Sequence, residues 1–351
     1  MGSSFTYSGL NTKIHGMRSK LISSDEYNEI TGLSSVPDVI QYLASHPGYS
    51  GLFPDTPDDD FYHRENLEQI LTVSLYENFS KIYTFSTMKQ RKFLELYFMH
   101  FEIRLIKKFL RRMYNDNPLN VDIPRLEPYF ERFSDIPVAR AGQASDIDEL
   151  INALEGTIYE APLKKAHDLS GNNLFNYEIS LDLLQYKTFW KQKGKFMSGT
   201  DLDVITDAYG YKIDLLNIQW IYRCKKYYTM TTSDILSMVI PVHYKLKKQQ
   251  LVELADTENA EAFLKILKTT IYGKGLDVPE DVSVEKCYRK LMHNHYVKIF
   301  RQHPYSLACV STYLYLQERE TETLTHITEC IRYSYPPEDI RKFLKIGGEQ
   351  H

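Results

Sequence analysis

Residues 209–228, YGYKIDLLNIQWIYRCKKYY, are the stretch that decides how this chain folds. After Gly210 it contains no glycine or proline, so the stretch predicts an uninterrupted helix. At ~100° per residue the apolar side chains fall on two nearly opposite faces. One face carries Ile213, Leu216, Trp220, Cys224 and Tyr227, and the other carries Leu215, Ile218 and Tyr222. The remaining narrow polar strip consists of Lys212, Gln219, Arg223 and Lys226. A helix that is apolar on two sides is expected to pack between other helices.

Two other stretches repeat this design, at residues 97–113 (YFMHFEIRLIKKFLRRM) and 313–332 (YLYLQERETETLTHITECIR). Alignment on the acidic residues Glu102, Asp214 and Glu320 brings their apolar positions into register. The spacings are 214 − 102 = 112 and 320 − 214 = 106 residues. This period is too long for a short solenoid repeat, and it predicts a domain-sized unit used three times.

A recurring tyrosine gives a second measure of the same period. The sequence Leu-x-x-Thr-x-Tyr occurs at 154–159 and 267–272, and a looser version ends at Tyr49. Tyr49, Tyr159 and Tyr272 are separated by 159 − 49 = 110 and 272 − 159 = 113 residues. We therefore predict an all-α protein of three similar helical units, at residues 1–115, 116–228 and 229–351. The proline-containing segment 115–145 is expected to be a connector with one short helical piece.

The overall composition excludes several classes of protein. The net charge of −4 gives no global field that would recruit nucleic acid. No segment is long and apolar enough to cross a membrane. The basic runs at 107–112 (KKFLRR) and 245–250 (KLKKQQ) are more typical of solvated or inter-helix faces than of nucleic-acid patches. The scattered cysteines, Cys224, Cys287, Cys309 and Cys330, predict free thiols rather than disulfides or a zinc site.

Candidate catalytic or ligand-binding residues are few. The chain has no phosphate-binding glycine loop and no nucleophile elbow. His293 and His295 are two residues apart on a predicted helix and point about 200° apart, so they cannot share a metal ion. His100 and His326 are interpreted as packing residues. We therefore predict no cofactor, no metal and no small-molecule substrate.

The repeated carboxylates need partners, because a carboxylate on a mostly apolar helix must be hydrogen-bonded or paired. A basic residue nine positions after Glu102 or Asp214 lies ~13.5 Å further along the helix, too far for pairing within one helix. We interpret the pairing as occurring between neighbouring helices. The strips concerned hold Lys107 and Arg111, then Gln219 and Arg223, and finally Thr325 and Glu329. These strips are expected either to face one another at junctions between units or to line a common interior.

The C-terminal run YLYLQERETETLTHITECIRY (313–333) resembles the last long helix of the V-type ATPase central-stalk connector. This connector is the C subunit of the bacterial and archaeal enzymes and the d subunit of the eukaryotic ones. The matching residues are Gln317, Glu318, Glu320, Leu324, Ile327, Glu329, Cys330 and Ile331. The opening GLNTKIHGMRSKLIS (9–23) and the Leu-x-x-Thr-x-Tyr step are also similar to the family. The asparagine that relatives often carry at the Thr323 position appears here as Asn217, and His46-Pro47-Gly48 departs from the Thr-x-Tyr pattern.

This resemblance implies a funnel of three helical units around a pseudo-threefold axis. Its base would sit on the cytoplasmic side of the membrane proteolipid rotor ring, and its mouth would receive the central shaft subunits, D and F. The implied role is peripheral and non-catalytic, namely torque transmission for ATP-driven proton or sodium transport. Glu102, Asp214, Asn217 and Glu320 would set the register of the units. Partner or inter-unit contacts are expected at Lys107, Arg111, Lys212, Gln219, Arg223, Lys226, Glu318 and Glu329.

Two alternatives stay open at this point. One is a helical scaffold that binds a partner in a concave face and has no role in rotation. The other is an all-α hydrolase whose Glu/His site, with Glu102 or His100, carries no recognisable motif.

Overall fold

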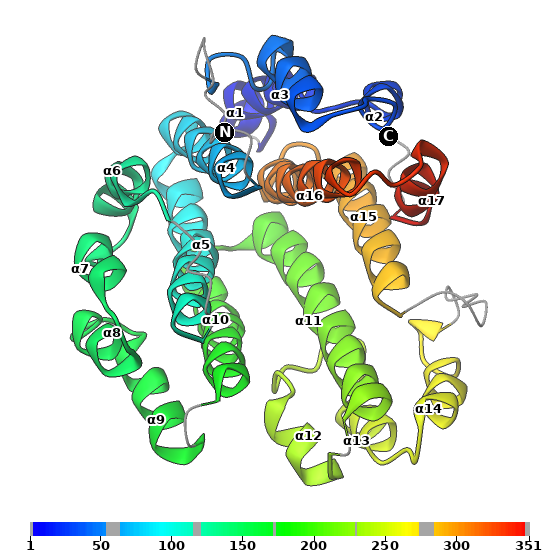
Figure 1. The fold of residues 1–351 in the computed structure, drawn as a ribbon. Helices are drawn as coiled ribbons and strands as arrows, with labels where there is room; N and C mark the ends of the chain where they lie inside the picture. Colours follow the sequence, from blue (N-terminus) through cyan, green and yellow to red (C-terminus); the bar gives the residue numbers. More distant parts are fainter. Residues whose placement is uncertain are drawn as a thin grey trace.

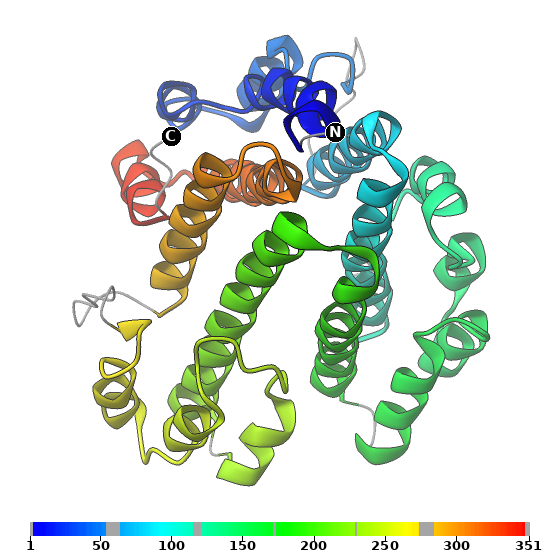
Figure 2. The ribbon, with the colours of Figure 1, turned by 180° about the vertical axis from the view of Figure 1, so that it is seen from behind.

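The computed structural model describes residues 3–53, 64–114, 121–170, 173–228, 230–273 and 284–347, and every regular element in these ranges is a helix. The longest helices form the inner part of the molecule (Figure 1): α4 (Arg64–Phe85), α5 (Met88–Tyr114), α10 (Leu174–Phe196), α11 (Gly199–Tyr227), α15 (Val284–Gln302) and α16 (Leu307–Arg332). Shorter helices surround them, as Figure 2 shows from behind. They are α1 (Ser3–Arg18), α2 (Ser24–Ile30), α3 (Val36–Ser45), α6 (Ile123–Phe133), α7 (Val138–Gln143), α8 (Ile147–Ala153), α9 (Glu160–Ser170), α12 (Thr232–Met238), α13 (Lys248–Ala255), α14 (Ala260–Leu267) and α17 (Pro337–Gly347). The all-α prediction is confirmed.

Helix α11 includes nearly all of the stretch with two apolar faces, and it is buried on two sides. Ile213, Leu215 and Ile218 are at most 3% exposed. The helix contacts α10 and α13 through α16, which explains why both faces are apolar. Tyr227, which the wheel places on a buried face, is 59% exposed. It is the last residue of the helix, so its side chain lies at the edge of the packed region.

Capping residues decide where several helices begin. The sequence predicts one helix over residues 7–31 with a possible break, and the structure divides this segment into α1 and α2. Ser23 starts α2 with a capping box, in which its hydroxyl accepts the Glu26 N–H and the Glu26 carboxylate accepts the Ser23 N–H. Thr231 and Asp234 form the same box before α12. The cap predicted at residue 232 or 233 is therefore one or two positions late.

The outer segment that follows α5 is more helical than predicted. The connector contains both α6 and α7 instead of one short helical piece, while residues 115–120 lie outside the described range. The sequence predicts a single helix over residues 146–160, whereas α8 ends at Ala153 and a separate helix, α9, begins at Glu160. Pro162 lies within α9 and does not stop it. A proline near the start of a helix is tolerated because the N–H groups there have no intrahelical partner.

The two ends of the chain share one apolar core. Ile22 of the loop after α1, Ile30 of α2 and Leu43 of α3 pack in a single cluster with Leu324 and Ile327 of α16. Figure 1 accordingly shows α2 and α3 beside α16 and α17, at the ends of the colour scale. The second half of α16, together with Ile340 and Leu344 of α17, therefore packs against the beginning of the chain.

Candidate functional site

Each of the three repeated carboxylates accepts a hydrogen bond from one of the three repeated tyrosines. The Oη–carboxylate distances are 2.6 Å for Tyr159 and Glu102, 2.7 Å for Tyr272 and Asp214, and 2.5 Å for Tyr49 and Glu320. The two sequence patterns that measured the period therefore meet in space at three places. We call each of these a carboxylate–tyrosine junction. Each junction ties a long inner helix to the turn that follows a short outer helix.

A second donor strengthens each junction. The backbone N–H of Ile22 lies 2.6 Å from Glu320, the backbone N–H of Leu246 lies 2.8 Å from Asp214, and the Ser134 hydroxyl donates to Glu102. Asp214 also accepts the N–H groups of Lys245 and Tyr244, at 2.7 and 3.3 Å. Positions 22, 134 and 246 are spaced by 134 − 22 = 112 and 246 − 134 = 112 residues. Sequence reasoning missed this third repeat, because two of its three donors are backbone N–H groups, which leave no side-chain signal for Ser134 to match.

Burial sets the electrostatics of the junctions. Burial raises the pKa of Glu102 and of Asp214 above the ordinary carboxyl range, and the hydrogen bonds from the tyrosine and its neighbours oppose that rise. Burial together with the adjacent Glu320 raises the pKa of Tyr49 well above its usual value. The phenol therefore keeps its proton and donates a hydrogen bond to the carboxylate. Hydroxyl and backbone N–H groups therefore donate the hydrogen bonds to Glu102 and Asp214, where the sequence suggested basic side chains as partners.

The threonine of the Leu-x-x-Thr-x-Tyr step shapes the turn that presents the tyrosine. Thr157 Oγ1 donates to the Leu154 carbonyl oxygen at 2.7 Å. Thr270 Oγ1 donates to the Leu267 carbonyl oxygen, also at 2.7 Å. The local hydrogen bond closes the turn that follows the outer helix and directs the tyrosine two residues later toward the long helix.

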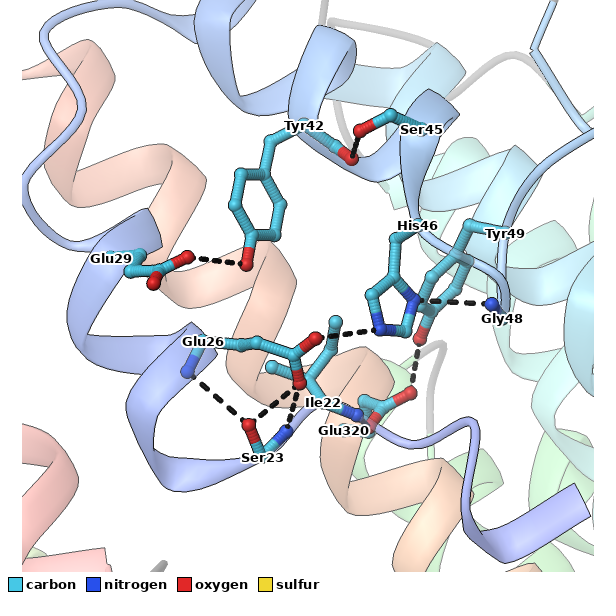
Figure 3. A network of polar contacts seen from close by, with 10 residues as sticks. All are labelled: Ile22, Ser23, Glu26, Glu29, Tyr42, Ser45, His46, Gly48, Tyr49 and Glu320. Atoms are coloured by element: carbon cyan, nitrogen blue, oxygen red, sulfur yellow. Dashed lines mark hydrogen bonds and ion pairs between the residues drawn. The ribbon is translucent and has the colours of Figure 1, made fainter.

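The turn that carries Tyr49 is built differently, as Figure 3 shows. His46 Nδ1 accepts the Gly48 N–H at 3.1 Å, and His46 Nε2 lies 3.2 Å from a carboxylate oxygen of Glu26. A Cβ atom on Gly48 would lie 2.4 Å from the backbone carbonyl oxygen of Lys20. The close approach of the loop after α1 therefore explains the glycine at the x position before Tyr49. The threonine position itself is occupied by Pro47.

Asn217 fixes the position of a neighbouring loop. Its Nδ2 donates to the Ile240 carbonyl oxygen at 3.0 Å, and its Oδ1 accepts the Ile240 N–H at 2.8 Å. The side chain is completely buried. The Ile240 N–H thus depends on this one amide, while the Ile240 carbonyl oxygen also accepts the Val242 N–H at 2.8 Å. The buried N–H that needs an acceptor accounts for an asparagine in the middle of an apolar helix.

The predicted contact residues fall into different environments. Lys107 and Arg111 of α5 form 2.6 Å ion pairs with Asp182 and Glu178 of α10, so they join two helices. Glu329 pairs with Arg332 of its own helix at 3.1 Å. On α11, Lys212 Nζ lies 5.9 Å from the Tyr186 ring centre and Lys226 Nζ lies 5.5 Å from the Tyr222 ring centre. Gln219 is half-buried, and Arg223 and Lys226 are exposed.

Glu318 lies where α5 and α16 meet. Its Oε1 accepts the Tyr97 hydroxyl at 2.5 Å and lies 3.2 Å from His100 Nε2. Burial alone would raise the pKa of Glu318, but the charges of His100, Lys212 and Arg104 outweigh it and lower the pKa to about 2. His100 Nδ1 also lies 3.2 Å from Gln185 Nε2. These contacts make the group an internal polar link between helices.

The other residues considered for chemistry have structural partners. His295 Nε2 pairs with Asp207 at 3.2 Å, and its ring stacks on Tyr211 at 3.8 Å between centres. All four cysteines are free. In the part of the chain that is described, no group of three or more His, Cys, Asp or Glu side chains is arranged to hold a metal ion. Over the same residues, no helix combines the length and apolar character that a membrane crossing requires.

Comparison of the sequence with known proteins identifies one family. The family model for the ATP synthase (C/AC39) subunit matches residues 10–343. Among similar proteins, the C subunit of the A-type ATP synthase of Thermococcus kodakarensis is 23% identical over 349 residues, covering 96% of this chain and 90% of the relative. The corresponding C subunits of Pyrococcus horikoshii and Methanosphaera stadtmanae are 26% and 24% identical, and cover 96% and 97% of this chain and 90% and 88% of the relatives. The family suggested by the C-terminal helix is therefore confirmed, and the chain belongs to the ATP synthase (C/AC39) subunit family.

Proposed function

We propose that this protein is the non-catalytic central-stalk subunit of a rotary ATPase, which couples the rotor shaft to the membrane proteolipid ring. Its family makes it a subunit of an ATP synthase. In the proposed role it sits peripherally on the cytoplasmic face of the membrane, binds the shaft subunits, D and F, and transmits torque for ATP-driven proton or sodium transport. The three units would form the pseudo-threefold funnel expected from the family resemblance.

The observation that supports this role is the carboxylate–tyrosine junction, which occurs three times. A body that transmits torque must keep its shape under load, so its helices need cross-links that do not slide. A buried hydrogen bond to a charged group contributes about 1.5–3 kcal/mol and holds a defined geometry. The third junction joins Glu320 to Tyr49 and Ile22, so it closes the chain from its last long helix back to its first helices.

Two features of the described residues are consistent with a coupling role. Charged side chains such as Lys107 and Arg111 connect inner helices rather than surrounding a reactive group. The carboxylate of Glu102, which the hydrolase alternative would use, is half-buried and accepts one hydroxyl donor on each oxygen. Both of its oxygens are thus held by neighbouring hydroxyl groups, whereas general acid–base chemistry would need one of them to bond a substrate.

Reconstitution tests the proposal directly. The chain is co-expressed with the other subunits of its complex, and assembly is followed by native mass spectrometry. We expect the chain to bind both the D–F shaft and the proteolipid ring. A complex assembled without it should keep ATP hydrolysis in the head but lose ATP-driven ion transport into vesicles. A chain that binds neither shaft nor ring would refute the proposal and favour the scaffold alternative.

A further inference from the structure

The groove between α5 and α10, beyond the turn that carries Tyr159, has the shape and charge of a docking site. It encloses a cavity of about 690 Å³. The apolar part of its lining includes Leu96 and Met99 of α5, Leu184 and Phe196 of α10, and Ile158 of the turn. Ile158 is 53% exposed and Phe196 is 38% exposed. Large apolar side chains so exposed beside a groove are typical of surfaces that bind another protein.

A row of lysines forms one rim of this groove. Lys187, Lys191 and Lys195 are all exposed. Each follows a groove-lining residue of α10 by three positions: Leu184, Thr188 and Gln192. Residues three apart are neighbours on a helix, so the lysines stand beside the groove at intervals of about 6 Å along the axis.

Helix α10 separates its charges between two sides. Its carboxylates Glu178 and Asp182 point toward α5, where they pair with Arg111 and Lys107. At ~100° per residue, the three rim lysines are centred on nearly the opposite side of the helix. No ion pair of these lysines with a described carboxylate is found within 4 Å. The basic side of α10 is therefore left uncompensated by the described part of the chain.

On α10, the N-terminal half of the side that carries the lysines is covered by α9. Ser180 Oγ donates to the Pro162 carbonyl oxygen of α9 at 3.1 Å, and Tyr177 Oη lies 2.6 Å from Nδ1 of His167 in α9. Both α10 residues lie on the side that carries the lysines further along. Since α9 begins at Glu160, this cover stops where the groove starts. The groove thus continues a surface on which a helix already packs.

We propose that this groove binds an acidic amphipathic helix of another subunit of the rotary complex, and the proposal rests on the function given above. The apolar stripe of that helix lies on Leu184, Ile158 and Phe196. Its carboxylates, repeated every four residues, face Lys187, Lys191 and Lys195. The charged lining of the groove itself is mostly acidic, with Glu95 and Glu102 on α5 and Glu131 and Asp135 at the end near α6. The acidic side of the incoming helix therefore faces the lysines of α10 and is turned away from these carboxylates.

Charge reversal tests the lysine rim in the assembled complex. The variant K187E/K191E/K195E is compared with K89E/K165E/K248E, which changes net charge equally at exposed lysines on α5, α9 and α13. We expect the rim variant to weaken association with the partner subunit about tenfold at low salt, with a smaller effect at high salt, because exposed ion pairs are screened. The control variant should bind like the unmodified chain. Equal binding by both variants would overturn the proposal.

The apolar lining of the groove can be tested at Ile158, for which the same chain offers a matched control position. Ile158 and Ile271 occupy equivalent positions in the two Thr-x-Tyr turns, and both are 53% exposed. We expect Ile158→Asp to weaken the association and Ile271→Asp to leave it unchanged, while thermal melting shows both variants folded. Equal effects of the two substitutions would contradict a specific role for this groove.

A photo-crosslinking amino acid at Gln192 identifies the occupant. We expect a crosslink to an acidic helix of another subunit in the purified complex. Crosslinks to lipid alone would show that the groove contacts a membrane surface and would refute the proposal. Binding to phosphatidylglycerol vesicles that the rim variant abolishes would lead to the same conclusion. If the complex assembles and transports ions while no crosslink forms and the rim variant binds normally, this inference fails and the central-stalk function stands.

Discussion

Removal of a single tyrosine hydroxyl group from a carboxylate–tyrosine junction should lower the free energy of unfolding. The loss should be larger where fewer hydrogen-bond donors to the carboxylate remain. Tyr159→Phe leaves Glu102 with the Ser134 hydroxyl as its donor among the described residues. Tyr272→Phe leaves Asp214 with three backbone N–H donors. Both tyrosines are 2% exposed, so the phenylalanine ring fills the same space and the change isolates the hydrogen bond.

The expected magnitudes follow from these donor counts. A hydrogen bond to a charged group contributes about 1.5–3 kcal/mol, and an incompletely satisfied buried acceptor adds a desolvation cost. We expect Tyr159→Phe to lower the free energy of unfolding by about 2 kcal/mol. Tyr272→Phe should lower it by about 1 kcal/mol, because three N–H groups still solvate the carboxylate. For a chain of this length, about 2 kcal/mol corresponds to a decrease in melting temperature of about 3 °C.

Urea unfolding followed by circular dichroism measures these differences, with both variants and the parent protein under the same conditions. A double variant that adds Glu102→Gln to Tyr159→Phe gives the coupling between the two groups by a double-mutant cycle. Equal losses from the two tyrosine substitutions, or a coupling near zero between Tyr159 and Glu102, would refute the reasoning that donor count at the carboxylate determines stability.

Three further predictions concern single positions. Glu318→Gln should make the stability of the protein less dependent on pH in acid. The folded pKa of Glu318 is lowered to about 2, so its contribution of about 3 kcal/mol is present above the unfolded pKa near 4.5 and is lost as pH falls toward 2; the variant should show a flatter stability–pH profile there. Asn217→Ala should lower the free energy of unfolding in urea by about 1–3 kcal/mol, because it leaves the Ile240 N–H without a partner while the Ile240 carbonyl oxygen keeps the Val242 N–H; a loss below about 0.5 kcal/mol would contradict this. Gly48→Ala should lower the melting temperature through its clash with the preceding loop, while Gly9→Ala, which meets nothing within 4 Å, should leave it unchanged or raise it.

Much of the helical content could be predicted from the order of residues alone. Apolar periodicity and capping residues are local, and they predict helices from Pro37 to near His46 and at about 62–84, 87–114 and 304–334. The corresponding helices, α3, α4, α5 and α16, begin and end within a few residues of these positions. The errors lie in the outer segment after α5, where a proline near a helix start suggests a stop and α9 is missed. There, long-range packing decides between helix and loop, and local pattern carries little information about it.

The candidate site could be predicted in part. The recurrence of Glu102, Asp214 and Glu320, and of Tyr49, Tyr159 and Tyr272, is visible because a carboxylate on an apolar helix and a repeated turn motif both leave side-chain signals. The donors at positions 22 and 246 are backbone groups, which nearly any residue type provides, so no pattern could reveal them. The unit boundaries at 115/116 and 228/229 and the partner-contact residues stay predictions.

By itself, the sequence determined that this protein is helical and that its motifs recur three times, because amphipathic periodicity and constant spacing are properties of the chain in order. Only the tertiary structure decided which tyrosine meets which carboxylate. Glu102 bonds a tyrosine 57 residues later, whereas Glu320 bonds Tyr49, 271 residues earlier. That last contact closes the chain on itself. A hydrogen bond between groups so far apart in sequence depends on the packing of whole helices, so no local pattern could specify it.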